Sequence, residues 1–206
     1  LTGAETLIAD PAIDAIVIVS PTSAHHEHII MAAERGKAIF AEKPIADSVE
    51  HAKAAVEAVQ RAGVPFQIGF QRRFDPGYAR AKALIDEGAI GTPEMFRGLT
   101  CDRMPPVEYL RTSGGVFWDL GIHDFDAARF LMGDDIAAVH ATGSIIIEPA
   151  LAEFDDVDHG IVTLRFQRGG LGVVQNTWRA PYGYDIRAEV HGSLGKVGTD
   201  LDERVP

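Results

Sequence analysis

Short apolar runs alternate with stretches of helical periodicity over the first third of the chain. The predicted order is a helix ending near residue 9, then strand 15–19, helix 26–34, strand 38–41, helix 47–62 and strand 65–70. The run at 15–19 is continuously apolar and largely β-branched, which is typical of a strand buried on both faces of a parallel sheet. Asp47–Ser48 is a capping pair, and Gly63 follows the same helix as its stop. Strands and helices that alternate with short links favour right-handed crossovers and a parallel α/β sheet.

The pattern changes near residue 73. Helices are predicted at 76–87 and 116–132, and strands at 94–100, 137–147, 160–167, 170–178 and 185–190. Residues 102–113 are polar, contain the pair Pro105–Pro106, and are predicted to form a loop. Arg168–Gly170 is a hairpin turn signal between two strands. We therefore expect an α+β second part whose open sheet is mostly antiparallel, with the domains at 1–72 and 73–206.

Composition excludes several classes of protein. The 206 residues are 46% hydrophobic, which is ordinary for a globular chain. The net charge is −11, from 30 acidic and 19 basic residues, and it disfavours binding to nucleic acid or anionic lipid. No apolar run is long enough to cross a bilayer. The single cysteine, Cys101, excludes an internal disulfide, and the lack of a targeting segment predicts a cytoplasmic protein.

Glu42–Lys43–Pro44 comes directly after a predicted parallel strand. Ligands of open α/β sheets bind beyond the carboxyl ends of the strands. A lysine at that place would bring an ammonium group to the ligand, with Glu42 close enough to orient it or to contact a cofactor. The alternative is an ordinary loop with exposed charges.

A second candidate lies in residues 114–124. The pair Gly114–Gly115 permits close backbone approach or unusual dihedral angles before a helix. Asp119 and His123 are at positions i and i+4, so on a helix they share a face and their side chains can meet. A carboxylate beside an imidazole favours a proton acceptor that works near neutral pH. The alternative is an ion pair on the helix surface.

Two further segments follow predicted strands. Residues 21–28 offer Thr22 and backbone amides for a cofactor. The run His26–Glu27–His28 lacks the spacing of a zinc-binding helix, so we expect no metal site. Arg72 and Arg73 are suited to a polar substrate, a domain interface or structural salt bridges. No glycine-rich G-x-G-x-x-G, P-loop or G-x-S-x-G motif is present, which disfavours phosphoryl and acyl transfer.

Four segments in this order resemble one family, the Gfo/Idh/MocA oxidoreductases, and most of all its myo-inositol 2-dehydrogenase branch. They are residues 15–25, 36–44, 69–75 and 114–124. The resemblance covers nearly the whole chain. It implies a partial Rossmann-type parallel sheet that binds NAD or NADP, followed by an α/β domain for substrate and oligomer contacts. It also implies oxidation of a secondary alcohol of a polyol or sugar, with a homodimer or homotetramer as the assembly.

The resemblance also implies a role for individual residues. The lysine, aspartate and histidine of the family's active site match Lys43, Asp119 and His123, with His123 as the base, Asp119 supporting it, and Lys43 holding the hydroxyl. Substrate contacts are expected from those three residues and from Arg72 and Asp102. The residues expected to line the cofactor are Ser20, Thr22, His25, Glu42, Lys43 and Gln71.

The chain departs from the family in one respect. A complete member starts with a strand and a glycine-rich loop that binds the pyrophosphate, and neither is present before residue 15. We therefore expect this chain to be part of a longer enzyme. The alternative is a non-catalytic ligand-binding or oligomeric protein derived from a dehydrogenase.

Overall fold

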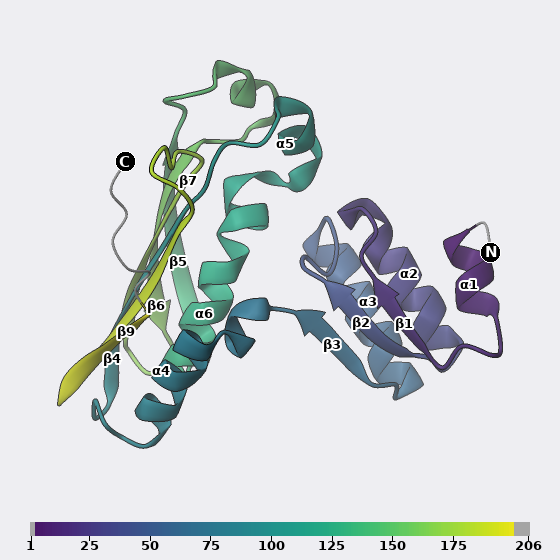
Figure 1. Cartoon of the computed structure of the whole chain (residues 1–206), viewed down its shortest axis with the longest axis horizontal. Coiled ribbons are helices and arrows are strands. Elements are labelled where there is room, and N and C mark those ends of the chain that lie inside the picture. The colour runs from purple at the N-terminus through teal and green to yellow at the C-terminus, as the bar shows by residue number, and fades with distance from the viewer. Residues whose placement is uncertain (1–2, 200–206) are drawn as a thin grey trace. The chain divides into compact units, whose positions relative to one another are not determined.

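A computed structural model of the chain describes residues 3–199, and the chain divides after Phe70 into two compact units. Figure 1 shows both units. The elements of the first unit are α1 (Ala4–Ala9), β1 (Ala15–Ile18), α2 (Thr22–Glu34), β2 (Ala38–Glu42), α3 (Val49–Ala62) and β3 (Phe66–Gly69). Their order and type follow the prediction, although α2 begins at Thr22, four residues earlier than expected.

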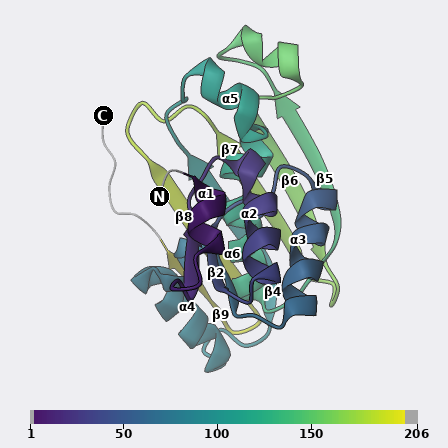
Figure 2. The ribbon, with the colours of Figure 1, turned by 90° about the vertical axis from the view of Figure 1, so that its right-hand side faces the viewer.

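The first unit is a parallel three-stranded sheet in the order β1-β2-β3. Alternate strand residues, such as Ile16 and Ile39, pack with Ile29 of α2 and Ala55 of α3 in one core. Figure 2 shows α2 and α3 side by side. Burial of β1 on both faces was a wrong expectation, because Val17 is 68% exposed. Among the described residues, the helices cover the other face of β1, which is formed by the side chains that alternate with Val17.

The second unit contains twelve described elements. They are η1 (Gln71–Phe74), α4 (Pro76–Asp86), β4 (Pro93–Cys101), α5 (Val107–Ser113), η2 (Val116–Leu120), α6 (Ile122–Met132), β5 (Ile136–Ser144), η3 (Pro149–Phe154), β6 (His159–Phe166), β7 (Leu171–Thr177), β8 (Asp185–Gly192) and β9 (Gly195–Thr199). The strands form one sheet in the order β5-β6-β7-β4-β8-β9. Every pair is antiparallel except β4 with β7, which confirms the mostly antiparallel sheet.

Helix α6 packs across β4, and α4 packs beside it (Figure 1). Phe96, Leu131 and Phe166 are fully buried in the core beneath these helices. The hairpin predicted at Arg168–Gly170 joins β6 to β7, so this prediction is confirmed. Among the described residues, no helix is long and apolar enough to span a membrane.

Two predictions about this unit were wrong. The expected loop at 102–113 contains α5, whose Leu110 is buried against Val116 and Trp178. That tertiary contact stabilises a helix with little local signal. The expected single helix at 116–132 is instead the π-helix η2 followed by α6, with Gly121 between them. A Cβ atom at Gly121 would lie 2.8 Å from Asn176 Oδ1, so the chain passes too close to β7 for a larger residue.

Candidate active site

In the first unit, the predicted site residues gather at the carboxyl ends of β1 and β2. Ser20 follows β1, Thr22 is the first residue of α2, and Glu42 and Lys43 stand at the end of β2. Parallel strands bring these ends to one edge of the sheet. Glu42 Oε2 accepts a hydrogen bond from the Lys43 amide at 3.3 Å. Glu42 also lies against Gly69, where a Cβ atom would be 2.9 Å from its Oε1 atom, so the glycine at the end of β3 makes room for this carboxylate.

His25 joins the two loops at this edge. Its side chain is buried, with Nδ1 2.7 Å from the carbonyl oxygen of Pro44 and Nε2 2.7 Å from that of Ser20. The ring therefore connects the loop after β1 to the loop after β2, next to Lys43. Both ring nitrogens face protein carbonyls, which makes His25 a positioning residue for the loops. Its predicted contact with the cofactor stays a prediction.

In the second unit, two glycines introduce the segment that carries Asp119 and His123. Gly114 and Gly115 both have φ of +87°, a left-handed region that favours glycine. A Cβ atom at Gly115 would lie 2.4 Å from Asp156 Oδ1, and the same oxygen accepts a hydrogen bond from the Val116 amide at 2.9 Å. The prediction of unusual dihedral angles and close approach at this pair is confirmed.

Asp119 and His123 belong to consecutive helices. Asp119 is half-buried on η2 and accepts a hydrogen bond from the Tyr109 hydroxyl at 2.8 Å. Burial and this hydrogen bond to the carboxylate raise the pKa of Tyr109 to about 12, so the phenol stays a donor. His123 is buried in the first turn of α6. The expected placement on one continuous helix was wrong, and direct pairing of the two side chains stays a prediction.

Arg72 and Arg73 both pair with aspartates of α6. The Arg72 Nη1 atom lies 2.6 Å from Asp124 Oδ1, and the Arg73 guanidinium makes two hydrogen bonds to Asp126, at 2.6 and 2.9 Å. These contacts fix η1 on α6 and confirm the salt-bridge alternative for both arginines. Arg72 is only 5% exposed. Its substrate contact stays a prediction.

The pair of Arg72 and Asp124 is embedded in a closed polar network. Arg72 Nη2 donates to Thr100 Oγ1 at 2.7 Å, Thr100 donates to Asp124 at 2.9 Å, and Asn176 donates to the other carboxylate oxygen at 2.7 Å. Burial raises the pKa of the Asp124 carboxyl, while Arg72 and the hydrogen bonds act against that shift. Asp124, which all of these contacts share or adjoin, directly follows His123 in the chain. The network therefore anchors the first turn of α6 to β4 and β7.

The two remaining predicted residues stand at element ends. Asp102 is half-buried just after β4, where its amide donates to the Thr177 carbonyl at 3.0 Å and its carboxylate accepts from the Arg103 amide at 2.6 Å. Gln71 is an exposed residue at the start of η1. The predicted site residues therefore divide into two groups. One belongs to the first unit (Ser20, Thr22, His25, Glu42 and Lys43), and the other belongs to the second (Gln71, Arg72, Asp102, Asp119 and His123).

Sequence reasoning missed Tyr109, which contacts Asp119, and the network partners Thr100 and Asn176. Val107 and Leu110 are apolar and three positions apart, and this spacing was a local sign of a helix at Tyr109. Thr100 and Asn176 lie on different strands, and nothing in the linear sequence joins them. The described residues also include one group of side chains that could ligate a metal ion, His26, Asp47 and His51. The expectation of no metal rests on the run at 26–28, whereas Asp47 and His51 come from other segments.

Comparison with known proteins matches both units to one family. Residues 2–70 match the oxidoreductase family with the NAD-binding Rossmann fold, and residues 78–198 match the GFO/IDH/MocA C-terminal domain. The chain is 48% identical over 192 residues to the scyllo-inositol 2-dehydrogenase (NAD(+)) of Bacillus subtilis (strain 168), covering 93% of this chain and 56% of that protein.

Solved structures agree. The crystal structure of a myo-inositol dehydrogenase from Corynebacterium glutamicum ATCC 13032 has a TM-score of 0.91 and 38% identity, covering all of this chain and 62% of that one. The structure of scyllo-inositol dehydrogenase from Lactobacillus casei, with bound NAD(H) and scyllo-inositol, has a TM-score of 0.87 and 30% identity, covering 99% of this chain and 61% of that one. The chain thus spans less than two thirds of these relatives. Because both units match in order and over nearly the whole chain, the protein belongs to the Gfo/Idh/MocA oxidoreductase family.

Proposed function

We propose that the protein containing this chain oxidises a secondary alcohol of a cyclic polyol or sugar, as an inositol 2-dehydrogenase does. The observation that carries the proposal is the 48% identity to a scyllo-inositol 2-dehydrogenase over 93% of the chain. Polar groups at the carboxyl edge of the sheet in the first unit, and at the start of α6 in the second unit, support the proposal.

NAD or NADP is the proposed cofactor. The first unit fits this role, since hydroxyl, carboxylate and ammonium groups stand at one edge of a parallel sheet, and the glycine at position 69 leaves space for the Glu42 side chain. Ser20, Thr22, Glu42 and Lys43 would hold the cofactor there, and Gln71 stays a further proposed cofactor contact. When bound, the nicotinamide ring accepts the hydride.

The chain's own residues supply the proton chemistry. His123 takes the hydroxyl proton as a general base, and Asp119 supports the imidazolium that results. The Tyr109 hydroxyl donates to Asp119 and so holds that carboxylate in place. The Lys43 ammonium group donates a hydrogen bond to the substrate oxygen and stabilises the negative charge that develops on this oxygen. Arg72 and Asp102 remain the proposed further substrate contacts.

We also propose a homodimer or homotetramer, located in the cytoplasm. Apolar side chains on three neighbouring strands of the second unit support self-association, since Met95, Ile161 and Leu171 are each exposed by more than 40%. Patches of this kind mark protein interfaces when they are contiguous. The buried free thiol of Cys101 is consistent with a reducing compartment. Light scattering of the purified protein measures the oligomeric state directly.

The test is reduction of NAD or NADP by the complete natural protein with a panel of inositols and aldoses. Lys43→Ala and His123→Ala should each lower kcat/KM by at least about 100-fold. Lys53→Ala, which changes an exposed lysine of α3, and His140→Ala, which changes an exposed histidine of β5, are controls expected to keep full activity. A protein that binds NAD but oxidises no polyol would support the non-catalytic alternative. Full activity in both site variants would refute the residue assignment.

A further inference from the structure

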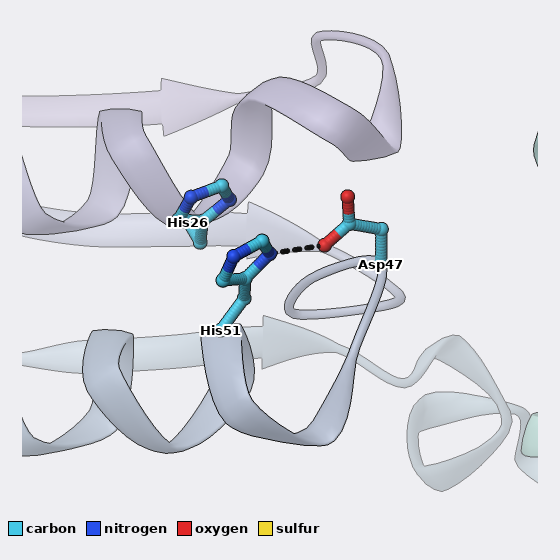
Figure 3. Close-up of side chains that lie close together, drawn as sticks. All are labelled: His26, Asp47 and His51. Atoms are coloured by element: carbon cyan, nitrogen blue, oxygen red, sulfur yellow. Dashed lines mark hydrogen bonds and ion pairs between the residues drawn. The ribbon is translucent and has the colours of Figure 1, made fainter.

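Two helices and a loop of the first unit bring together His26, Asp47 and His51 (Figure 3). His26 lies on the second turn of α2, Asp47 in the loop between β2 and α3, and His51 on the first turn of α3. The two imidazole rings are stacked, with centroids 4.0 Å apart and planes 8° from parallel. Asp47 Oδ1 is 2.6 Å from His51 Nδ1. The cluster is thus assembled by the packing of α2 on α3.

The composition of the cluster is that of a site for a borderline divalent ion. Two imidazoles and a carboxylate are common ligands of Zn²⁺ and of Co²⁺, Ni²⁺ and Cu²⁺. One donor atom from each residue lies within 4.8 Å of the others. Donors that share a Zn²⁺ ion stand roughly 3.4 Å apart, because each lies about 2.1 Å from the metal. The rings are stacked nearly parallel, so at least one imidazole must turn about its side-chain bonds before both nitrogen lone pairs can point at one ion.

Burial and charge at the cluster favour a cation. His26 Nδ1 is buried and has no hydrogen-bond partner among residues 3–199, which is a costly state for an imidazole nitrogen. The side chains of His51 and Asp47 are 48% and 45% exposed, so an ion can enter from solvent and keep water ligands. Asp47 places a carboxylate oxygen 2.6 Å from His51 Nδ1, at the edge of the stacked rings. Two imidazoles and a carboxylate therefore bring nitrogen and oxygen ligand atoms together at one place on the surface of the first unit.

We propose that His26, Asp47 and His51 bind one divalent transition-metal ion of the Zn²⁺ type. The site is separate from the proposed active site, and its test needs neither cofactor nor substrate. An ion bound there would tie α2, α3 and the loop containing Asp47 together. This loop begins at Lys43, four residues before Asp47, so metal binding restricts the backbone next to the proposed active-site lysine. His28, which the histidine run first suggested, is 3.1 Å from Ser20 Oγ through its Nδ1 atom and is not part of the site.

Calorimetric titration of untagged, EDTA-treated protein with ZnCl₂ tests the proposal. The wild-type protein should bind one Zn²⁺ ion at micromolar concentrations. His26→Gln, Asp47→Asn and His51→Gln should each weaken binding by at least about 10-fold, since even indirect partners of a metal contribute that much. His191→Gln is the matched control, because His191 makes a 2.6 Å contact with the carboxylate of Glu189 in a half-buried pair outside the cluster. This control should bind Zn²⁺ as the wild-type protein does.

A measurement on the wild-type protein alone covers the case in which a variant fails to fold. Zn²⁺ should protect His26 and His51 from diethyl pyrocarbonate, read by mass spectrometry, and should leave His191 reactive. Co²⁺ should give the visible absorption bands of a protein-bound ion. No Zn²⁺ binding at micromolar concentrations, unchanged affinity in the three variants, or no protection of His26 and His51 would each overturn the proposal.

Discussion

Removing either member of the buried pair Arg72–Asp124 should strongly destabilise the second unit. Arg72 is 5% exposed and Asp124 is 1% exposed, and their contact of 2.6 Å joins η1 to α6. Breaking a buried ion pair by deleting one partner costs about 3–5 kcal/mol, because the other charge stays buried without compensation. That is a large part of the roughly 5–15 kcal/mol by which a domain is stable.

The two single variants should differ. Asp124→Leu leaves a guanidinium that cannot lose its proton, so we expect a loss near the upper end of that range, about 5 kcal/mol. Arg72→Met leaves a carboxyl whose pKa burial raises, and this group can take up a proton. We expect a loss of about 3 kcal/mol at pH 7. Because the folded form of this variant binds the proton more tightly than the unfolded form, the loss should shrink as pH falls through the raised pKa.

Within this chain, tryptophan fluorescence during urea unfolding reports on the second unit. The chain has two tryptophans, Trp118 and Trp178, and both belong to that unit. The double variant Arg72→Met with Asp124→Leu completes the thermodynamic cycle and should recover at least about 2 kcal/mol of the summed losses. A loss below about 1 kcal/mol for Asp124→Leu, or a coupling energy near zero, would refute the reasoning, since the pair would then be of little importance to stability.

Two further predictions concern other buried contacts. Asp158 is fully buried; burial raises its pKa, but the hydrogen bonds from His159 and from the amides of residues 146–148 outweigh this and lower it. The second unit should therefore keep this stabilisation above pH of about 4 and lose it as pH falls through the lowered pKa. Asp158→Asn should make the stability of the unit depend less on pH in this range, as measured by acid unfolding monitored by fluorescence. His25→Ala removes a ring that lies 2.7 Å from the carbonyls of Ser20 and Pro44, so hydrogen exchange should quicken about 10-fold or more at residues 20–24 and 43–46. Unchanged exchange there would show that the ring does not hold the two loops.

The sequence by itself determined the local elements and the kind of chemistry. The Ser48 side chain accepts a hydrogen bond from the His51 amide at 3.1 Å, and Gly63 ends α3 with a φ of +66°. Both features agree with the predicted caps of this helix. The apolar run after residue 14 became β1, and the order of strands and helices predicted the parallel sheet. These signals are local, since caps, turns and strand runs depend on a few neighbouring residues. For the same reason, Lys43 could be placed at the end of a strand.

The tertiary structure alone decided how distant residues meet. Arg72 and Asp124 are 52 positions apart, and α5, without a strong pattern of its own, forms against a buried cluster. Residues expected to continue one helix instead form η2 and α6, because Gly121 lies against Asn176 and the Val116 amide bonds to Asp156. His26 and His51 meet because α2 packs on α3. Contacts of this kind depend on the packing of whole elements, which the pattern of neighbouring residues does not encode.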